Sequence, residues 1–234
     1  MNKKLVISSH NADLEWLSMT YDYGFSPENT IIYDRSTEEK DWSHLGESIR
    51  SPNVGENIYD MMRFIIDHYD NLPDVTLFVK GNLFQRREEW GGENYYTTRE
   101  RFCRALQAEY FLPIERFHET TAFNINGCGY NEPTWEASSN PTIYTKHFSN
   151  FPEMMDKLFV NAPTFPYNRF APGANYVVPK ANLLKFSKGL YEKLQFYCSY
   201  KPPAEFQSTT GESFLMERAL YLIWTEDLVE KLRK

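Results

Sequence analysis

Residues 56–80 read ENIYDMMRFIIDHYDNLPDVTLFVK. Up to Tyr69 the apolar side chains recur at three- and four-residue spacing, which predicts an amphipathic helix of about four turns. Pro73 ends this helix, and the run of residues 75–79 (VTLFV) predicts a buried strand that stops at Lys80. A helix followed closely by a buried strand is the unit from which parallel sheets are built.

The residues before this stretch repeat the same alternation. Residues 4–8 (KLVIS) and 29–34 (NTIIYD) read as strands, and residues 13–17 (DLEWL) read as the start of a helix that Asn11 would cap. Residues 36–52 are polar and turn-rich, which predicts a loop. We therefore expect an α/β fold of the Rossmann-like kind, with a mainly parallel sheet flanked by helices.

The residues after Lys80 are less regular. We expect helices over 99–112, 180–193 and 210–224, a strand over 174–178, and a weak point at 187–189 inside the second helix. Residues 113–172 are rich in Pro, Asn and aromatic residues, which predicts long loops around one short helix over 153–159. No repeat divides the chain, so we expect one domain over 1–234, with two halves that meet near residue 112.

Composition and charge exclude several classes of protein. The 234 residues are 41% hydrophobic and 24% charged, as in globular proteins, and the net charge of -7 argues against nucleic-acid binding. The three cysteines, Cys103, Cys128 and Cys198, have neither zinc-ligand nor disulfide-framework spacing. No apolar run is long enough to span a membrane and no targeting segment is evident, so we expect a cytoplasmic protein.

Aromatic residues make up 16% of the chain. Rings pack into cores, but they also stack on flat ligands and on sugar faces. Those in the loop-rich middle are the candidates for ligand contact: Trp90, Tyr130, Trp135, Tyr144 and Tyr167.

Polar residues follow three predicted strands. The first strand is followed by Ser8, Ser9, His10, Asn11 and Asp13, the second by Asp34 and Arg35, and the third by Lys80, Gly81 and Asn82. Open parallel sheets bind ligands beyond the carboxyl ends of their strands, although polar residues also end strands for purely structural reasons. The sequence has no G-x-G-x-x-G fingerprint and no P-loop, which disfavours dinucleotide binding and ATP hydrolysis.

The turn before the central helix is a second candidate. Asn53, Gly55 and Glu56 stand where backbone N–H groups could face an anion. The structural alternative is local capping by Asn53, a positive φ at Gly55 and a favourable helix-dipole contact from Glu56.

Several motifs resemble a known family. Residues 53–82 (NVGENIYDMMRFIIDHYDNLPDVTLFVKGN), 10–17 (HNADLEWL), 170–180 (FAPGANYVVPK) and 217–224 (ERALYLIW) resemble in order and spacing the domain-of-unknown-function family numbered 3431. The same layout is similar to nucleotide-sugar glycosyltransferases of the GT-A type. That resemblance implies a GT-A-like fold, a UDP- or GDP-sugar donor and a saccharide acceptor.

Two departures from these patterns affect the expected chemistry. Glu56 stands where the family usually has Arg, and Asn57 where it has Glu. The place of the metal-binding Asp-x-Asp of GT-A enzymes reads Lys80-Gly81-Asn82, so Lys80 is expected to supply the positive charge, with Arg86, Arg87 or Arg169 as further candidates. No metal ligands are assigned, and Mn²⁺ or Mg²⁺ is left open as a cofactor; a solvated lysine is the structural alternative for Lys80.

Two acids on the last predicted helix are candidates for the general base of glycosyl transfer. Glu212 resembles the position of that base, and Glu217 is expected to orient groups or contact the sugar. A capping box at 209–212 and an ion pair with Arg218 are their structural alternatives. The expected donor-binding residues are Ser8, His10, Asn11, Asp13, Asp34, Arg35, Asn53, Glu56 and Asn82, and the expected acceptor-binding residues are Gly173, Ala174, Asn175 and Trp135.

The sequence therefore predicts a glycosyltransferase that uses a nucleoside diphosphate sugar. A glycan-binding protein on a catalytically decayed transferase scaffold is the alternative, because the Asp-x-Asp is missing. A glycosidase would instead need two acids about 5–10 Å apart across a cleft.

Overall fold

A six-stranded mixed sheet forms the centre of the protein, which we describe from a computed structural model. The structure describes residues 1–38, 40–85, 97–115, 144–162, 170–171, 173–206 and 210–231. The strands lie in the order β3-β2-β1-β4-β6-β5. Their bounds are Lys3–Ser9 (β1), Thr30–Asp34 (β2), Glu47–Arg50 (β3), Val75–Lys80 (β4), Leu112–Pro113 (β5) and Tyr176–Pro179 (β6).

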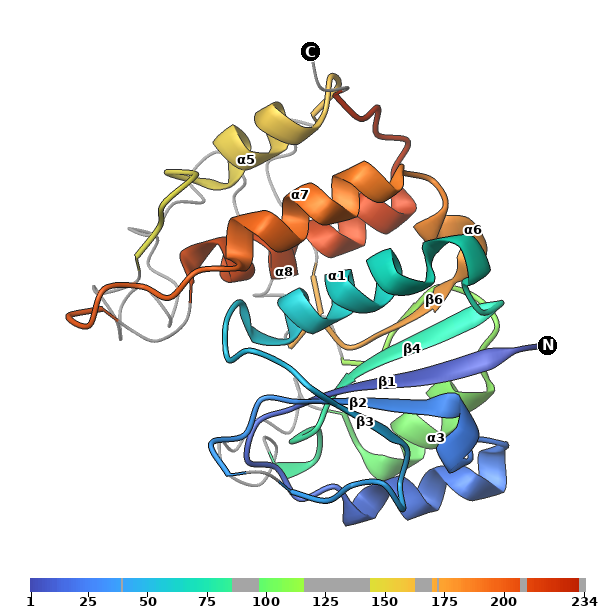
Figure 1. Cartoon of the computed structure of the whole chain (residues 1–234). Helices are drawn as coiled ribbons and strands as arrows, with labels where there is room; N and C mark the ends of the chain where they lie inside the picture. The colour runs from blue at the N-terminus through green and yellow to red at the C-terminus, as the bar shows by residue number, and fades with distance from the viewer. Residues whose placement is uncertain are drawn as a thin grey trace.

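Helices cover both faces of this sheet (Figure 1). One face carries α1 (Glu56–His68), α7 (Lys188–Cys198) and α8 (Gly211–Thr225), with α5 (Phe151–Leu158) packed over α8. The opposite face carries η1 (Glu15–Tyr23) and α3 (Arg99–Gln107). The short elements are η2 (Pro27–Asn29), η3 (Tyr69–Asn71) and α6 (Lys180–Leu183). The chain is a single-domain α/β protein with a mostly parallel sheet.

Two hydrophobic cores follow from the alternation of side chains along the strands. On β1, Val6 points into the core beneath α1, α7 and α8, whereas Leu5 and Ile7 point into the core beneath η1 and α3. On β4, Phe78 and Leu77 divide in the same way. Burial on both faces explains why these strands read as unbroken apolar runs.

The direction of the strands sets where the site lies. Strands β3, β2, β1 and β4 are parallel, and β6 is antiparallel to both β4 and β5. After β3 the chain crosses back through α1 to β4, on the other side of β1. The strand order therefore reverses between β1 and β4, and their carboxyl ends define the switch point at which open α/β sheets bind ligands.

The sequence predictions of β1, β2, α1, β4, α5 and α8 are confirmed, with ends that differ by a few residues. The predicted loop over 36–52 was wrong for residues 47–50, which form β3, and the helix expected over 99–112 ends at Gln107, before β5. The helix expected over 180–193 is two helices, because Ser187 caps α7 by accepting a hydrogen bond from the Leu190 N–H.

Asn11 does not cap the first helix, which is the 3-10 helix η1 and begins after Leu14. Its backbone is left-handed, with a φ of 55°. Among the described helices, none is long and apolar enough to cross a membrane.

Candidate functional site

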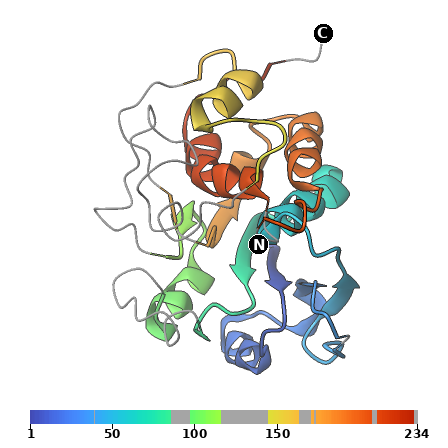
Figure 2. The same cartoon turned by 90° about the vertical axis from the view of Figure 1, so that its left-hand side faces the viewer.

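The three polar strand ends that the sequence singled out meet at the switch point. Ser8 pairs in register with Lys80 across β1 and β4, and Ser9 pairs with Asp34 across β1 and β2. Figure 2 looks onto this edge of the sheet, toward which the parallel strands point. The predicted convergence of these strand ends is confirmed.

The alternation of side chains along the strands places four polar side chains from the strand ends under α1. Ser8 continues the face of Val6, and Arg35 continues the face of Ile31 and Tyr33, all on the α1 side. Lys80 and Ser51 follow Phe78 and Ile49 in the same manner. From the helix side, Glu56 and Asp60 are four residues apart in line with the buried Phe64, so they face the sheet. We call this group the switch-point cluster: Ser8, Arg35, Ser51, Glu56, Asp60 and Lys80.

Asp60 is the buried centre of the switch-point cluster, with 0% of its surface exposed. Its two carboxylate oxygens accept hydrogen bonds from the hydroxyls of Ser8 and Ser51, the latter at 2.5 Å. The Nε of Arg35 lies 3.2 Å from Oδ2 of Asp60. Burial raises the pKa of Asp60 to about 6, against the opposing effects of Arg35 and the two hydroxyls. This carboxylate therefore joins β1, β2, the end of β3 and α1 at one point.

Glu56 stands at the outer end of the cluster. Its Oε2 lies 3.9 Å from Nη2 of Arg35 and 3.8 Å from Nζ of Lys80, and 39% of its side chain is exposed. The backbone is left-handed at both Gly55 (φ 61°) and Glu56 (φ 53°). At Gly55 an added Cβ would lie 2.7 Å from the carbonyl oxygen of Cys198, so only glycine lets α1 begin this close to α7. The expected positive φ at Gly55 is confirmed.

The predicted donor-binding residues around the cluster connect neighbouring loops. Asn11 donates from its backbone N–H to Ser36 Oγ at 2.8 Å and accepts from the Thr37 N–H at 3.2 Å. Arg50 pairs with Asp34 at 3.4 Å and donates to the Ser36 carbonyl. These contacts hold the loops after β1, β2 and β3 together.

The remaining predicted donor-binding residues lie farther out. His10 Nε2 and Asn53 Nδ2 are 3.4 Å apart at the surface. Exposed Asp13 accepts from the Glu15 N–H, and Asn82 is half-buried.

The turn over 173–175 connects the cluster to α8 and to β5. The Asn57 amide donates to the Gly173 carbonyl at 2.9 Å, and Glu217 of α8 accepts from the Gly173 N–H. Asn175 Oδ1 accepts from the Lys80 N–H at 2.7 Å, and its amide donates to the buried Glu115 at 3.1 Å. Three predicted acceptor-binding residues, Gly173, Ala174 and Asn175, therefore lie beside β4 and α1. Ala174 also has a left-handed backbone, with a φ of 51°.

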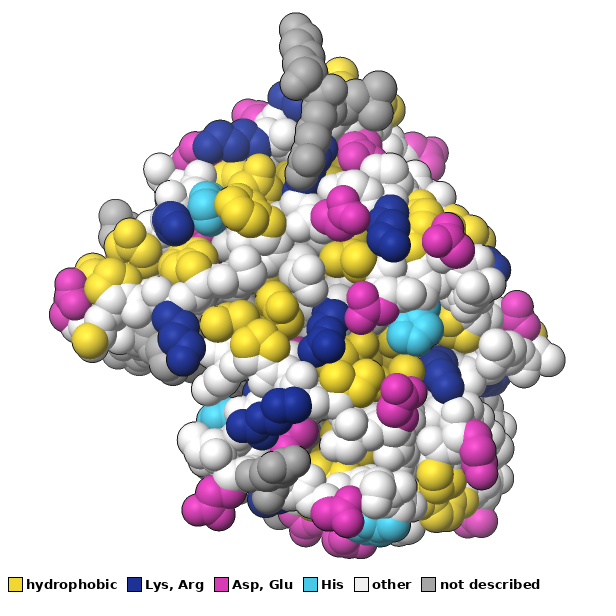
Figure 3. All heavy atoms as spheres, in the orientation of Figure 1, with side chains coloured by type: hydrophobic (Ala, Val, Ile, Leu, Met, Phe, Trp, Pro, Cys, Tyr) yellow, Lys and Arg dark blue, Asp and Glu magenta, His cyan; other side chains and the backbone are white. Residues whose placement is uncertain are grey.

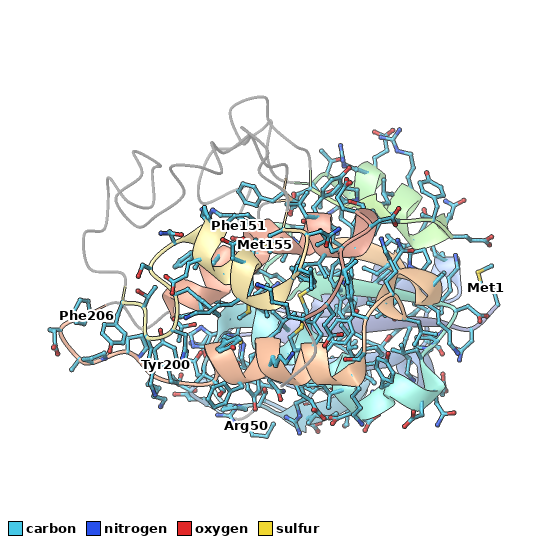
Figure 4. All side chains as sticks on the ribbon, turned by 90° about the horizontal axis from the view of Figure 1, so that it is seen from above. Met1, Arg50, Phe151, Met155, Tyr200 and Phe206 are labelled. Atoms are coloured by element: carbon cyan, nitrogen blue, oxygen red, sulfur yellow. The ribbon has the colours of Figure 1, made fainter. Side chains whose placement is uncertain are left out.

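Glu212 occupies a different environment. It is completely buried, and its Oε1 accepts from the N–H groups of Lys146 (2.8 Å) and His147 (2.6 Å), while Oε2 accepts from the Tyr200 hydroxyl. We call this group the Glu212 anchor (Lys146, His147, Tyr200 and Glu212). Figure 4 labels Tyr200 and Phe206, which lie on the segment that follows α7. The structure thus separates the two acids predicted to act in catalysis.

Of the loop aromatics proposed to contact sugars, only Tyr144 lies within the described residues. Its ring packs against Phe206 and Tyr200, with centroids 5.0 and 6.1 Å apart. The other predictions that fall outside the described residues are Trp90, Tyr130, Trp135, Tyr167, Arg86, Arg87 and Arg169.

The surface beside the switch point is indented. In Figure 3 the left-hand outline is notched on the side toward which the parallel strands point, and Lys and Arg side chains flank the notch. In the described parts of the chain, no three His, Cys, Asp or Glu side chains gather as ligands for a metal ion. The donor set seen there does not fit a divalent cation, so we assign no step to one.

Sequence reasoning missed four polar residues at this edge: Arg50, Ser51, Asp60 and Glu115. Asp60 sits in a helix that also carries charged residues on its solvent side, so its burial had no local signal. Glu115 follows β5, whose two residues are too few for a periodic pattern. For Ser51, the only available signal was its position after a strand that was itself missed.

Comparison with known proteins places the chain in a family. Comparisons with curated proteins and with solved structures gave no match. Residues 5–232 match the family described as "Protein of unknown function (DUF3431)", which confirms the resemblance seen in the sequence motifs. The chain therefore belongs to this family.

Proposed function

We propose that the protein transfers a glycosyl group from a nucleoside diphosphate sugar to a hydroxyl of a saccharide acceptor. The observation that carries this proposal is the meeting of Arg35 and Lys80 at the topological switch point, beside the carboxyl ends of β1 and β4. Switch points bind nucleotides in open α/β sheets. Arginine and lysine are the side chains that bind phosphate oxygens in proteins.

The donor diphosphate would lie against the two cations. Arg35 is 5% exposed and is oriented by Asp60, so its guanidinium is fixed before a ligand arrives. Fixed cations stabilise the charge that develops on a leaving diphosphate. Asp34 and Asn11, at the ends of the neighbouring loops, are proposed to contact the nucleoside.

The general base of the transfer is proposed to be Glu217. It is 13% exposed and one hydrogen bond from Gly173, which in turn binds Asn57 at the start of α1. The acceptor oxygen attacks the anomeric carbon, its proton passes to Glu217, and the diphosphate leaves with the electrons of the broken bond. The assignment of this role to Glu212 stays a prediction; the hydrogen bonds of the Glu212 anchor favour a role in holding the segment 144–147.

Donor binding and turnover test the proposal. A panel of UDP- and GDP-sugars, assayed by thermal shift and by release of the nucleoside diphosphate, should include a donor that raises the Tm and is hydrolysed or transferred. Lys80→Ala and Glu217→Gln should each abolish turnover, whereas Glu205→Gln, an exposed acid, should not. The absence of both binding and hydrolysis across the panel would refute the proposal.

A glycan-binding protein is the second candidate, and the Lys80-Gly81-Asn82 sequence in place of a metal-binding motif favours it. The same variants distinguish the two functions. In a glycan-binding protein, Lys80→Ala and Glu217→Gln would leave saccharide binding intact and there would be no turnover to lose.

A further inference from the structure

A continuous row of aromatic rings lies beside the Glu212 anchor. The rings come from two segments that are distant in the sequence, the end of α7 with the residues after it and the residues before α5. The centroids of successive rings are 5.0–6.1 Å apart, so each ring contacts the next. We call this group the aromatic row: Phe206, Tyr144, Tyr200, His147, Phe196 and Tyr197.

The aromatic row reaches the surface of the protein. Phe196 is 62% exposed, and the other five rings of the row are half-buried. In Figure 3, hydrophobic side chains gather on the face that carries α5 and α7. A single exposed apolar side chain is common in proteins, whereas a contiguous apolar surface marks a place where a ligand or a partner binds.

The protein fixes the rings of the row from beneath. Glu212 accepts hydrogen bonds from the His147 N–H and from the Tyr200 hydroxyl. Phe148, which is buried, packs against Tyr197 with ring centroids 4.6 Å apart. Rings that are already held in place lose little conformational entropy when a ligand binds to them. The Glu212 anchor therefore supports a binding surface as well as the fold.

Polar groups border the rings. The Nζ of Lys146 lies 5.7 Å from the ring centroid of Tyr200, and the Nζ of Lys157 lies 5.2 Å from that of Phe148. A sugar ring has C–H groups that stack on the negative face of an aromatic ring, and hydroxyls around its edge that accept hydrogen bonds from ammonium groups. A purely apolar partner would instead take these lysines out of water without replacing their hydrogen bonds. This combination of rings and donors favours a saccharide.

One part of the row lies beside the start of α1. Tyr197 and Tyr200 come directly before and shortly after Cys198, whose carbonyl oxygen would lie 2.7 Å from a Cβ added at Gly55. Glu56 of the switch-point cluster follows Gly55 in the chain. A ligand that lies along the row therefore has one end close to the proposed site of transfer.

We propose that the aromatic row binds a saccharide chain, with successive sugar residues stacked on successive rings. This inference rests on the proposed function, because the bound chain would be the acceptor whose terminal hydroxyl reaches the switch point. Several rings in one row can hold several linked sugar residues at once, which strengthens binding of a chain over that of a single sugar. The acceptor class is therefore an oligosaccharide or a polysaccharide.

The test begins with an array of immobilised oligosaccharides that differ in sugar, linkage and chain length, to which the full chain is applied. The oligosaccharide that binds best is then titrated into the protein by isothermal titration calorimetry, together with its shorter homologues. We expect the Kd to fall from the disaccharide to the hexasaccharide, because longer chains contact more rings.

Variants of the row separate its rings from the rest of the surface. Phe196→Ala should raise the Kd for the longest chain at least about fivefold, because it removes the most exposed ring. Phe206→Ala, at the other end of the row, should have a similar effect. Phe196→Tyr keeps a ring and should bind within about twofold of wild type. Tyr110→Ala removes a 65% exposed ring that follows α3, outside the row, and should leave the Kd unchanged. A Tm within a few degrees of wild type confirms that each variant folds.

Each outcome decides the inference. Weaker binding in Phe196→Ala, with wild-type binding in Phe196→Tyr and Tyr110→Ala, supports it. A chain that binds no saccharide of the array overturns it, as does an equal Kd for Phe196→Ala and wild type. A wild-type dimer that Phe196→Ala dissociates, measured by analytical ultracentrifugation, would assign the row to a second copy of the chain and would also overturn it.

Activity distinguishes this inference from the proposed function. Saccharide binding that depends on Phe196, without turnover of any nucleotide sugar, would support the aromatic row and refute the transferase. Transfer in which Phe196→Ala leaves the KM for the acceptor unchanged would keep the transferase and overturn the role of the row. If both hold, Phe196→Ala should raise the KM for the acceptor and leave kcat nearly unchanged, because the ring binds substrate away from the reacting atoms.

Discussion

The outer acid of the switch-point cluster, Glu56, and the central acid of the Glu212 anchor lie in different environments. Each oxygen of Glu212 accepts hydrogen bonds from neutral donors, at 2.6 and 2.8 Å for the two backbone N–H groups. In the switch-point cluster, by contrast, the outer acid Glu56 lies 3.8–3.9 Å from two cations. A buried carboxylate whose oxygens accept from neutral donors holds the fold, whereas a carboxylate that is 39% exposed beside two cations lies where a charged ligand could reach it.

The largest expected effect concerns the Glu212 anchor. Glu212→Ala leaves the N–H groups of Lys146 and His147 and the hydroxyl of Tyr200 without this acceptor in a buried place. We expect the free energy of unfolding to fall by about 3–5 kcal/mol, measured by urea denaturation. Glu205→Ala, an exposed acid near the same end of the molecule, is the matched control and should change it by less than about 0.5 kcal/mol. A small loss in Glu212→Ala would show that the anchor is not structural.

A second prediction uses the titration of Asp60. Burial raises its pKa from 3.8 to about 6, so between these values the folded protein binds a proton that the unfolded chain has lost. The free energy of unfolding contributed by Asp60 therefore falls as pH rises through this range, by about 3 kcal/mol in total.

Asp60→Asn removes this titration while keeping the shape of the side chain. The difference in free energy of unfolding, wild type minus Asp60→Asn, should decrease between pH 4 and 6 and become flat above pH 7. Asp67→Asn, an exposed acid on the same helix, provides the control. Parallel pH curves for wild type and Asp60→Asn would contradict the assignment.

A third prediction concerns the backbone at the start of α1. Gly55→Ala puts a Cβ 2.7 Å from the Cys198 carbonyl at a residue whose φ is 61°, and should cost about 2 kcal/mol by thermal or urea unfolding. Gly189→Ala is the matched control. Its nearest neighbour would be Ser187 Oγ at 3.4 Å, and alanine in α7 should stabilise the protein by about 0.5 kcal/mol. Equal effects from the two substitutions would contradict a special conformation at Gly55.

The switch-point cluster and the Glu212 anchor also differ in how much of each can be predicted from the sequence. The strand ends at Ser8, Asp34 and Lys80 were predictable, because each follows an apolar run and parallel strands end at the same edge. The strand β3 was not, because it is a four-residue edge strand whose side chains are mostly exposed and carry no apolar pattern.

Contacts between distant residues explain the remaining differences. Glu212 binds residues 65 and 66 positions earlier in the chain, and nothing near Glu212 in the sequence identifies these partners. Asp60 is similar, since Ser8 lies 52 residues before it. Hydrophobic periodicity and helix-capping patterns relate residues that are only a few positions apart. They therefore predict helices and strands, but they do not predict polar contacts between residues that are distant in the sequence.

The smallest expected effect on stability is that of Glu56→Gln. It tests directly whether Glu56, unlike Glu212, is dispensable for the fold. Glu56 is 39% exposed and its ion pairs with Arg35 and Lys80 are long, so the loss of its charge should change the free energy of unfolding by less than about 0.5 kcal/mol. The measurement is urea denaturation at low and high salt, where the small difference should shrink further as salt screens the charges. A loss comparable to that of Glu212→Ala would place Glu56 among the residues that hold the fold. A negligible loss would mean that the fold does not need this charge, in contrast to the buried charge of Glu212.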